Sequence, residues 1–122
     1  MKYSQLLWTA PEHLKQAILV DHGMIITTGS QLGDIYAFGI IMQEVILRGA
    51  PFCMTELTSK EIIAKIKKSP PLFRPSVSKT AAPPEYVNIM RECWSEQAEI
   101  RPNFVSFDLN HFIYYNEWAT II

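Results

Sequence analysis

Apolar positions along this chain recur at helical intervals and predict helices joined by loops that carry proline or glycine. Pro11 and Glu12 open a short helix that runs to about Ala17, because proline is tolerated in a first helical turn. Residues 18–33 contain three glycines and are predicted to form a loop. No segment gives a convincing strand pattern, so the sequence predicts an all-α unit.

The segment from Asp34 to Leu47 is apolar on nearly every helical face. A helix that is hydrophobic all round belongs inside a larger packing unit, so we expect other elements to surround it. Arg48 and Gly49 follow, and they supply a C-terminal positive charge and a glycine at the C′ position.

The next helix has the clearest start signal in the sequence. Thr58 and Glu61 form a capping box, and Leu57 and Ile62 have the spacing of a hydrophobic staple. The Pro70-Pro71 pair ends this helix. Its apolar face is Ile62, Ile63 and Ile66, and its lysines are Lys65, Lys67 and Lys68. The lysines are interpreted as a solvated face, with a basic binding patch as the alternative.

Two further helices are predicted after residue 82. The first opens at Pro83-Pro84 and lines one side with Tyr86, Met90, Cys93 and Trp94. The last begins near Pro102 and carries an aromatic stripe, interpreted as core: Phe104, Phe107, Phe112, Tyr115 and Trp118.

Composition limits the classes of function. The 122 residues suffice for one domain, and a formal net charge of −1 gives no general attraction to nucleic acid. Cys53 and Cys93 are forty residues apart with no histidine nearby, which argues against a zinc site or a disulfide framework. The start lacks a signal peptide, and Gln43 and Glu44 interrupt the longest apolar run, so no membrane span is expected.

The usual catalytic patterns are absent from the sequence. The glycines never fall as GxGxxG or GxxxxGK[ST], and His13, His22 and His111 show no ligand spacing. No acidic cluster indicates a bound cation. We therefore assign no catalytic, cofactor-binding or metal-binding residue and expect a helical module without its own active site.

An ordered set of short motifs is more specific. In sequence order these are Ala10-Pro11-Glu12, Asp34-x-Tyr36-x-x-Gly39, Cys93-Trp94 and Arg101-Pro102. Together they resemble the C-terminal helical half of a protein-kinase-like C-lobe, and the resemblance covers residues 6 to about 110. This predicts a partial kinase-like (kinase-homology) domain at residues 1–110 and a divergent C-terminal tail at residues 111–122.

Longer matches narrow the resemblance to the kinase-homology domain of membrane (receptor-type) guanylyl cyclases. They are residues 7–14, 39–45, 71–75 and 93–97. Residues 50–58 resemble the retinal and olfactory receptor cyclases in particular. Residues 18–29 are longer and more apolar than the corresponding loops of that family.

The resemblance implies a longer parent protein with an extracellular domain, one membrane span, this kinase-like domain, a coiled-coil linker and a cyclase domain that makes cyclic GMP from GTP. It implies that this chain lies on the cytoplasmic side of the plasma membrane, that its partners are the rest of the kinase-homology domain and the cyclase domain, and that the parent is a homodimer. ATP and Mg-GTP are expected for the intact parent. None is expected in this chain, because the nucleotide and metal ligands of the family would precede residue 1 or follow residue 122.

Four residues are predicted to be structural. The resemblance implies a buried ion pair between Glu12 and Arg101, with two unpaired surface charges as the alternative. The resemblance also matches Asp34 to the aspartate that opens the central helix of a kinase-like C-lobe and accepts hydrogen bonds from the catalytic loop. An aspartate at this position also favours a second interpretation, in which Asp34 is the N-cap of its own helix. Trp94 is interpreted as a core anchor.

Three functions are considered. The first is a regulatory, non-catalytic (pseudokinase) part of a receptor guanylyl cyclase. The second is a C-lobe fragment of an active protein kinase that performs ATP-dependent phosphotransfer. The third is a stand-alone interaction module.

Overall fold

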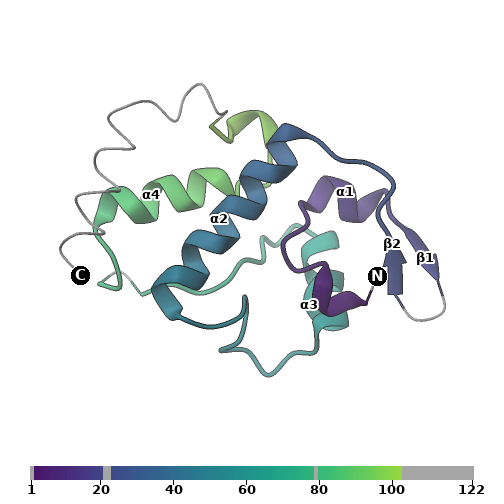
Figure 1. Ribbon diagram of the computed structural model, residues 1–122, viewed down its shortest axis with the longest axis horizontal. Coiled ribbons are helices and arrows are strands. Elements are labelled where there is room, and N and C mark those ends of the chain that lie inside the picture. The colour runs from purple at the N-terminus through teal and green to yellow at the C-terminus, as the bar shows by residue number, and fades with distance from the viewer. Residues whose placement is uncertain (1, 21–22, 79, 103–122) are drawn as a thin grey trace.

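Helix α2 (Gln31–Leu47) is the longest element and runs through the middle of the molecule (Figure 1). The computed structural model describes residues 2–20, 23–78 and 80–102. The other described elements are η1 (Tyr3–Gln5), α1 (Pro11–Lys15), β1 (Ile18–Val20), β2 (Gly23–Ile25), α3 (Ser59–Lys67), α4 (Pro84–Cys93) and η2 (Ala98–Ile100). The helix predicted from near Pro102, with its aromatic stripe, lies outside the described residues, as does the predicted tail at residues 111–122.

One hydrophobic cluster joins α2 to α4. Ile35, Tyr36 and Ile40 of α2 pack with Met90 and Cys93 of α4, and none of these side chains exposes more than 1% of its surface. In the same cluster the hydroxyl of Tyr86 donates a 2.8 Å hydrogen bond to the carbonyl of Met42. The four residues predicted to line one side of α4 are all buried, which confirms that prediction.

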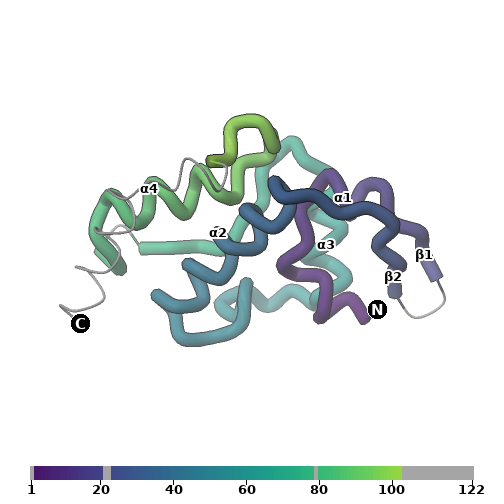
Figure 2. Tube along the Cα trace, turned by 45° about the horizontal axis from the view of Figure 1, so that its top comes forward, coloured from purple at the N-terminus to yellow at the C-terminus, as the bar shows by residue number. Residues whose placement is uncertain are grey.

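A second cluster lies at the other end of the molecule, among η1, α1, α3 and the two strands (Figure 2). It contains Leu14 of α1, Met24 of β2 and the predicted apolar face of α3, which is confirmed as buried. Phe52 stacks on Phe73 with ring centroids 5.2 Å apart. The two clusters divide the described core into a half around α4 and a half around α3.

The all-α prediction is wrong at residues 18–20 and 23–25, where the structure has a two-stranded antiparallel sheet in place of the predicted loop (Figure 1). Ile18 pairs with Ile25, Leu19 with Met24, and Val20 with Gly23. Three-residue strands are too short to show alternation, and Gly23, taken as a loop signal, begins β2. Burial of Met24 in the second cluster supplies a tertiary contact that no local pattern reports.

The helix ends differ from the predictions at three places. Helix α1 ends at Lys15 rather than near Ala17, and Arg48 rather than Gly49 takes the left-handed conformation after α2, with φ 57°. The assignment of Asp34 as an N-cap is wrong, because Ser30 caps α2 and accepts a 2.9 Å hydrogen bond from the Gly33 amide. The capping box of α3 at Thr58 is confirmed.

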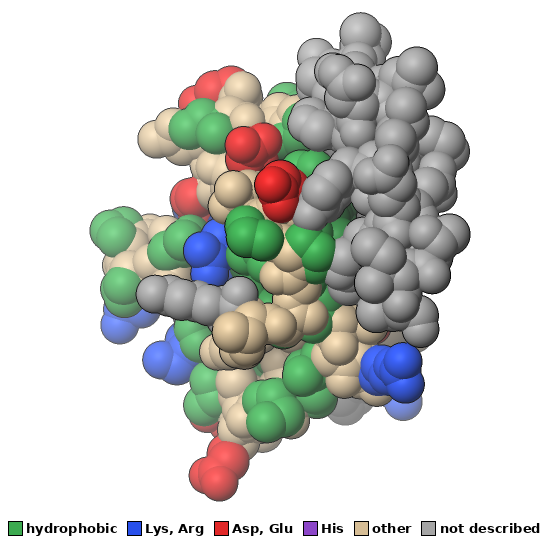
Figure 3. Space-filling view, turned by 90° about the vertical axis from the view of Figure 1, so that its left-hand side faces the viewer, with side chains coloured by type: hydrophobic (Ala, Val, Ile, Leu, Met, Phe, Trp, Pro, Cys, Tyr) green, Lys and Arg blue, Asp and Glu red, His purple; other side chains and the backbone are tan. Residues whose placement is uncertain are grey.

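Helix α2 is covered on one side only by the described residues. Its opposite side leaves Phe38, Ile41 and Val45 exposed by 41%, 46% and 45%. Hydrophobic side chains also reach the surface on the face of the molecule drawn in Figure 3. Among the described residues, the prediction that this helix is surrounded is therefore confirmed for its buried side and not for the side that carries Phe38, Ile41 and Val45. Within the described segments, no helix has the length and apolar character needed to cross a bilayer.

The close contact between α2 and α4 depends on Gly39. A Cβ atom added there would lie 2.9 Å from Cys93 Cβ and 3.1 Å from the Met90 carbonyl oxygen. We predict that Gly39→Ala lowers the free energy of unfolding by about 1–3 kcal/mol, because backbone atoms must move apart. Urea denaturation measures this. Gly29→Ala is the matched control, since nothing lies within 4 Å of its added Cβ, and an equal loss there would contradict the packing argument.

Candidate functional site

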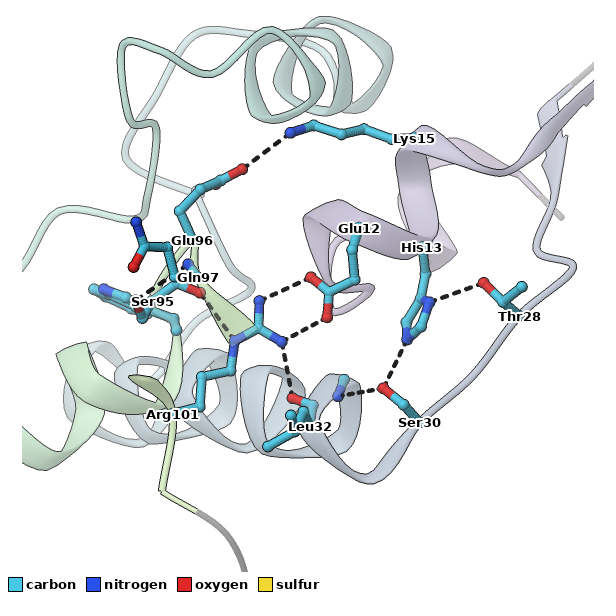
Figure 4. A network of polar contacts seen from close by, with 12 residues as sticks. Glu12, His13, Lys15, Thr28, Ser30, Leu32, Ser95, Glu96, Gln97 and Arg101 are labelled. Atoms are coloured by element: carbon cyan, nitrogen blue, oxygen red, sulfur yellow. Dashed lines mark hydrogen bonds and ion pairs between the residues drawn. The ribbon is translucent and has the colours of Figure 1, made fainter. Parts of the chain in front are cut away.

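The most extensive polar network in the described part of the chain is centred on Arg101 (Figure 4). Its Nη1 donates to Glu12 Oε2 at 2.7 Å, and its Nη2 donates to Glu12 Oε1 at 2.8 Å. Nη1 also donates to the Leu32 carbonyl at 3.0 Å, and Nε donates to the Ser95 carbonyl at 2.9 Å. The guanidinium therefore joins three separate segments of the chain.

Local structure brings the two charged groups together. Pro11 begins α1, which places Glu12 in the first turn of that helix. Arg101 follows η2 in an extended conformation, and its side chain is fully buried. A guanidinium presents its donors in a planar fork that matches a carboxylate, so the pair fixes orientation as well as distance.

The pKa of Glu12 lies below its ordinary value. Burial alone would raise it, but hydrogen bonds from Arg101 and from the backbone, together with the positive charge of Arg101, outweigh burial. A carboxyl with a lowered pKa in the folded state contributes stability above its unfolded pKa. That contribution is lost as pH falls through the folded value. At neutral pH the pair is therefore fully charged.

Tyr36 lies between two guanidinium groups. The Cζ of Arg74 is 5.1 Å from its ring centroid and the Cζ of Arg101 is 5.3 Å away, both within cation–π range. Burial raises the pKa of Tyr36 to about 12, although both arginines oppose the shift. The hydroxyl has no hydrogen-bond partner among the described residues, so the ring and not the hydroxyl is what the site uses.

The network extends to the surface through Glu96. Arg74 donates to Glu96 at 2.9 Å and to the Trp94 carbonyl at 2.8 Å. Lys15 at the end of α1 reaches the same carboxylate at 3.2 Å. This outer ion pair gives α1 a second connection to the segment after α4, but its partial exposure makes it weaker than the inner pair.

His13 connects the hairpin segment to α2 (Figure 4). Its Nδ1 lies 2.9 Å from the Thr28 hydroxyl and its Nε2 lies 3.0 Å from the Ser30 hydroxyl. A Cβ added at Gly33 would come within 2.7 Å of Nε2, so this glycine makes room for the imidazole. His13 thereby positions the residue that caps α2.

The structure places the four predicted structural residues in different environments. Glu12 and Arg101 form the ion pair described above, Trp94 is 5% exposed within the first cluster, and Asp34 is exposed in the first turn of α2. Among the described residues no three His, Cys, Asp or Glu side chains converge as metal ligands would. We call the Arg101 network the clamp, because its hydrogen bonds join α1, the first turn of α2 and the segment after α4.

Sequence reasoning did not identify three members of the network. Tyr36 was part of a recognised motif but had no assigned role, and Arg74 lay inside a matched segment in the same way. The sequence shows no ligand spacing around His13 and predicts a surface or loop residue there. Their roles depend on contacts over 15 or more positions, such as the bond from His13 to Thr28, and no local pattern carries that information.

Comparison with known proteins gives a consistent result. A family model described as protein tyrosine and serine/threonine kinase matches residues 1–110. Retinal guanylyl cyclase 2 of Rattus norvegicus is 53% identical over 100 residues, which covers 82% of this chain and 8% of that protein. Retinal guanylyl cyclase 1 of Bos taurus is 46% identical over 97 residues, which covers 80% of this chain and 8% of that protein. The chain therefore spans less than a tenth of the length of these relatives.

A double-mutant cycle tests the clamp. Glu12→Gln leaves the fully buried Arg101 guanidinium without its counter-charge, so it should lower the free energy of unfolding by about 3–5 kcal/mol. Arg101→Met should cost less, because the Glu12 side chain that it leaves behind is 32% exposed and can be hydrated. The double variant should lose much less than the sum of the two, which urea unfolding at pH 7 measures.

The pH supplies the control for this cycle. The coupling should be constant above the unfolded pKa of 4.5 and should shrink as pH falls further and Glu12 is protonated in the folded state. Additive single effects at pH 7, or a coupling that does not change with acid, would show that the pair contributes no specific stability.

Proposed function

Because this chain belongs to the protein tyrosine and serine/threonine kinase family and is similar to the retinal guanylyl cyclases, we propose that it is a regulatory part of a receptor guanylyl cyclase. In this proposal residues 1–110 form the C-terminal half of a kinase-like C-lobe within a kinase-homology domain. The observation that carries the proposal is the bidentate pair between Glu12 and Arg101, which joins the first and last of the recognised motifs.

The proposed role is mechanical rather than catalytic. The clamp holds α1 against the segment after α4, and the buried Tyr36 ring supports both arginines. Such an arrangement transmits a displacement of α1 to α2 and η2 as one body, because a bidentate pair resists both rotation and separation. A pseudokinase that relays a receptor's state to a cyclase domain needs this kind of rigid connection.

The remaining expectations concern the complete protein. We propose that it has a cyclase domain that converts GTP to cyclic GMP and that it functions as a homodimer. We also propose that this chain lies on the cytoplasmic side of the plasma membrane, with ATP in the cleft of the intact kinase-homology domain and Mg-GTP as the cyclase substrate. Support comes from the identity of 53% to Retinal guanylyl cyclase 2 of Rattus norvegicus.

A C-lobe fragment of an active protein kinase is the second candidate, favoured by the kinase family model that matches residues 1–110. The two candidates differ in the coding sequence upstream of residue 1. An active kinase has a catalytic-loop aspartate in an HRD motif there, whereas the pseudokinase proposal expects that aspartate to be replaced.

A chimera tests the proposal directly. We predict that replacing the matching 100 residues of rat Retinal guanylyl cyclase 2 with those of this chain preserves formation of cyclic GMP in isolated membranes. The same chimera with Arg101→Met should lose a large part of that activity, because the clamp no longer connects α1 to α2. A chimera that reaches the membrane at normal level but forms no cyclic GMP would contradict the proposal.

The isolated chain provides the complementary measurement. Millimolar ATP or Mg-GTP should leave its melting temperature unchanged, since a ligand stabilises only a folded state to which it binds. No cyclic GMP should form. A reproducible rise of several degrees with ATP would show that the nucleotide site lies within these residues, and formation of cyclic GMP by the isolated chain would refute the non-catalytic assignment.

A further inference from the structure

A groove with a volume of about 430 Å³ lies between the β1–β2 hairpin and α3. Figures 1 and 2 both place these elements at the same end of the molecule as the N-terminus. The described residues that line it are Tyr3, Leu19, Val20, Met24, Lys60, Ile63, Ala64 and Lys67. The groove is separate from the Arg101 network, and none of its lining residues takes part in that network.

One wall of the groove is a regular stripe along α3. Lys60, Ile63, Ala64 and Lys67 stand at positions i, i+3, i+4 and i+7, which share one helical face. At a rise of 1.5 Å per residue, the two lysine Cα atoms are about 10.5 Å apart along the helix axis. The stripe therefore has a positive charge at each end and apolar side chains between them.

The floor and the opposite wall are also apolar. Ile63 and Met24 are each 1% exposed and form a recessed floor, whereas Leu19 and Val20 on β1 expose 65% and 43% of their surface. Exposed apolar side chains that border a concave surface are typical of a binding site. Because β1 and β2 supply this wall, the groove depends on the two strands that the sequence did not predict.

The groove carries positive charge that no described lining residue neutralises. Two of its lining residues are lysines, and no acidic side chain is among the described residues that line it. The Nζ of the exposed Lys60 lies 5.9 Å from the centroid of the Tyr3 ring, within cation–π range and at the edge of the groove. A ligand that fits must be apolar in its centre and negative at both ends.

We propose that this groove binds a short amphipathic helix of a partner protein, with acidic residues at two positions seven apart and apolar residues three and four positions after the first. A helix laid along α3 has the same rise per residue, so its two carboxylates fall opposite Lys60 and Lys67. Its apolar pair enters between Leu19 and Ile63. The space between β1 and α3 is concave, which suits a helix better than a flat bilayer surface. This inference does not depend on the proposed function.

The test uses a fluorescent synthetic peptide, constrained as a helix, that contains Glu-x-x-Leu-Leu-x-x-Glu, and the complete 122-residue chain. Fluorescence anisotropy should show binding that weakens with added salt, because the contacts at both ends are charged. The variant with Lys60→Glu and Lys67→Glu should bind about tenfold or more weakly. The matched control, with Lys65→Glu and Lys68→Glu, makes the same change in net charge outside the groove and should bind as the unmodified chain does.

Charge reversal on both sides makes the test specific. A peptide with Lys-x-x-Leu-Leu-x-x-Lys should bind the variant with Lys60→Glu and Lys67→Glu but not the unmodified chain. Ala64→Trp fills the groove from an exposed position and should abolish binding of the first peptide without reversing charge.

Four outcomes would overturn the proposal. They are no binding of the first peptide, an equal loss of binding in the control variant, failure of the reversed peptide to bind the reversed variant, and unchanged binding after Ala64→Trp. Two alternative occupants are checked in parallel. If the peptide fails to bind and the chain instead binds phosphatidylserine vesicles, loss of that binding with Lys60→Glu and Lys67→Glu would assign the groove to a lipid surface. If the peptide fails to bind and the chain forms a dimer in sedimentation experiments, loss of the dimer with the same substitutions would assign the groove to a second copy.

Discussion

A cation can lie fully buried only where its hydrogen-bond donors are satisfied, and Arg101 meets this condition through contacts with three segments of the chain. Glu12 supplies the balancing charge from α1, Leu32 supplies a carbonyl from the first turn of α2, and Ser95 supplies one from the segment after α4. The three segments therefore share one buried donor group, and a shift of any one of them would lengthen its bond to the guanidinium. The relative positions of α1, α2 and η2 therefore follow from one side chain.

The two hydrophobic clusters set the larger arrangement in which this clamp works. The first cluster packs α4 against α2, and the absence of a side chain at Gly39 allows the two helices to approach closely. The second cluster packs α1, α3 and the two strands around Leu14. Hydrophobic packing is not directional, so it brings elements together without fixing their rotation. The bidentate pair and the Tyr36 ring between two arginines supply that direction. A regulatory role within a kinase-like domain, as proposed, requires both properties.

Features that depend on local chemistry could be predicted from the sequence. The capping box at Thr58, the buried face of α4 and the absence of a long apolar helix among the described residues all follow from residue type and spacing. Features that depend on distant contacts could not. Ser30 and not Asp34 caps α2, and Met24 of β2 is buried in the second cluster, a contact that the pattern of residues 18–20 and 23–25 does not report. The groove beside α3 was missed for the same reason, because these two strands form one of its walls.

Hydrogen exchange at the α1 amides in the Arg101→Met variant tests the central claim most directly. If one buried guanidinium holds α1, α2 and η2 together, removing it should accelerate exchange within residues 12–15, at Leu32 and after Ser95 alike, although the substitution lies 89 positions from Glu12. Glu12→Gln, which removes the other partner of the ion pair, should accelerate exchange in the same three segments. Accelerated exchange confined to the residues adjacent to each substitution would contradict the account.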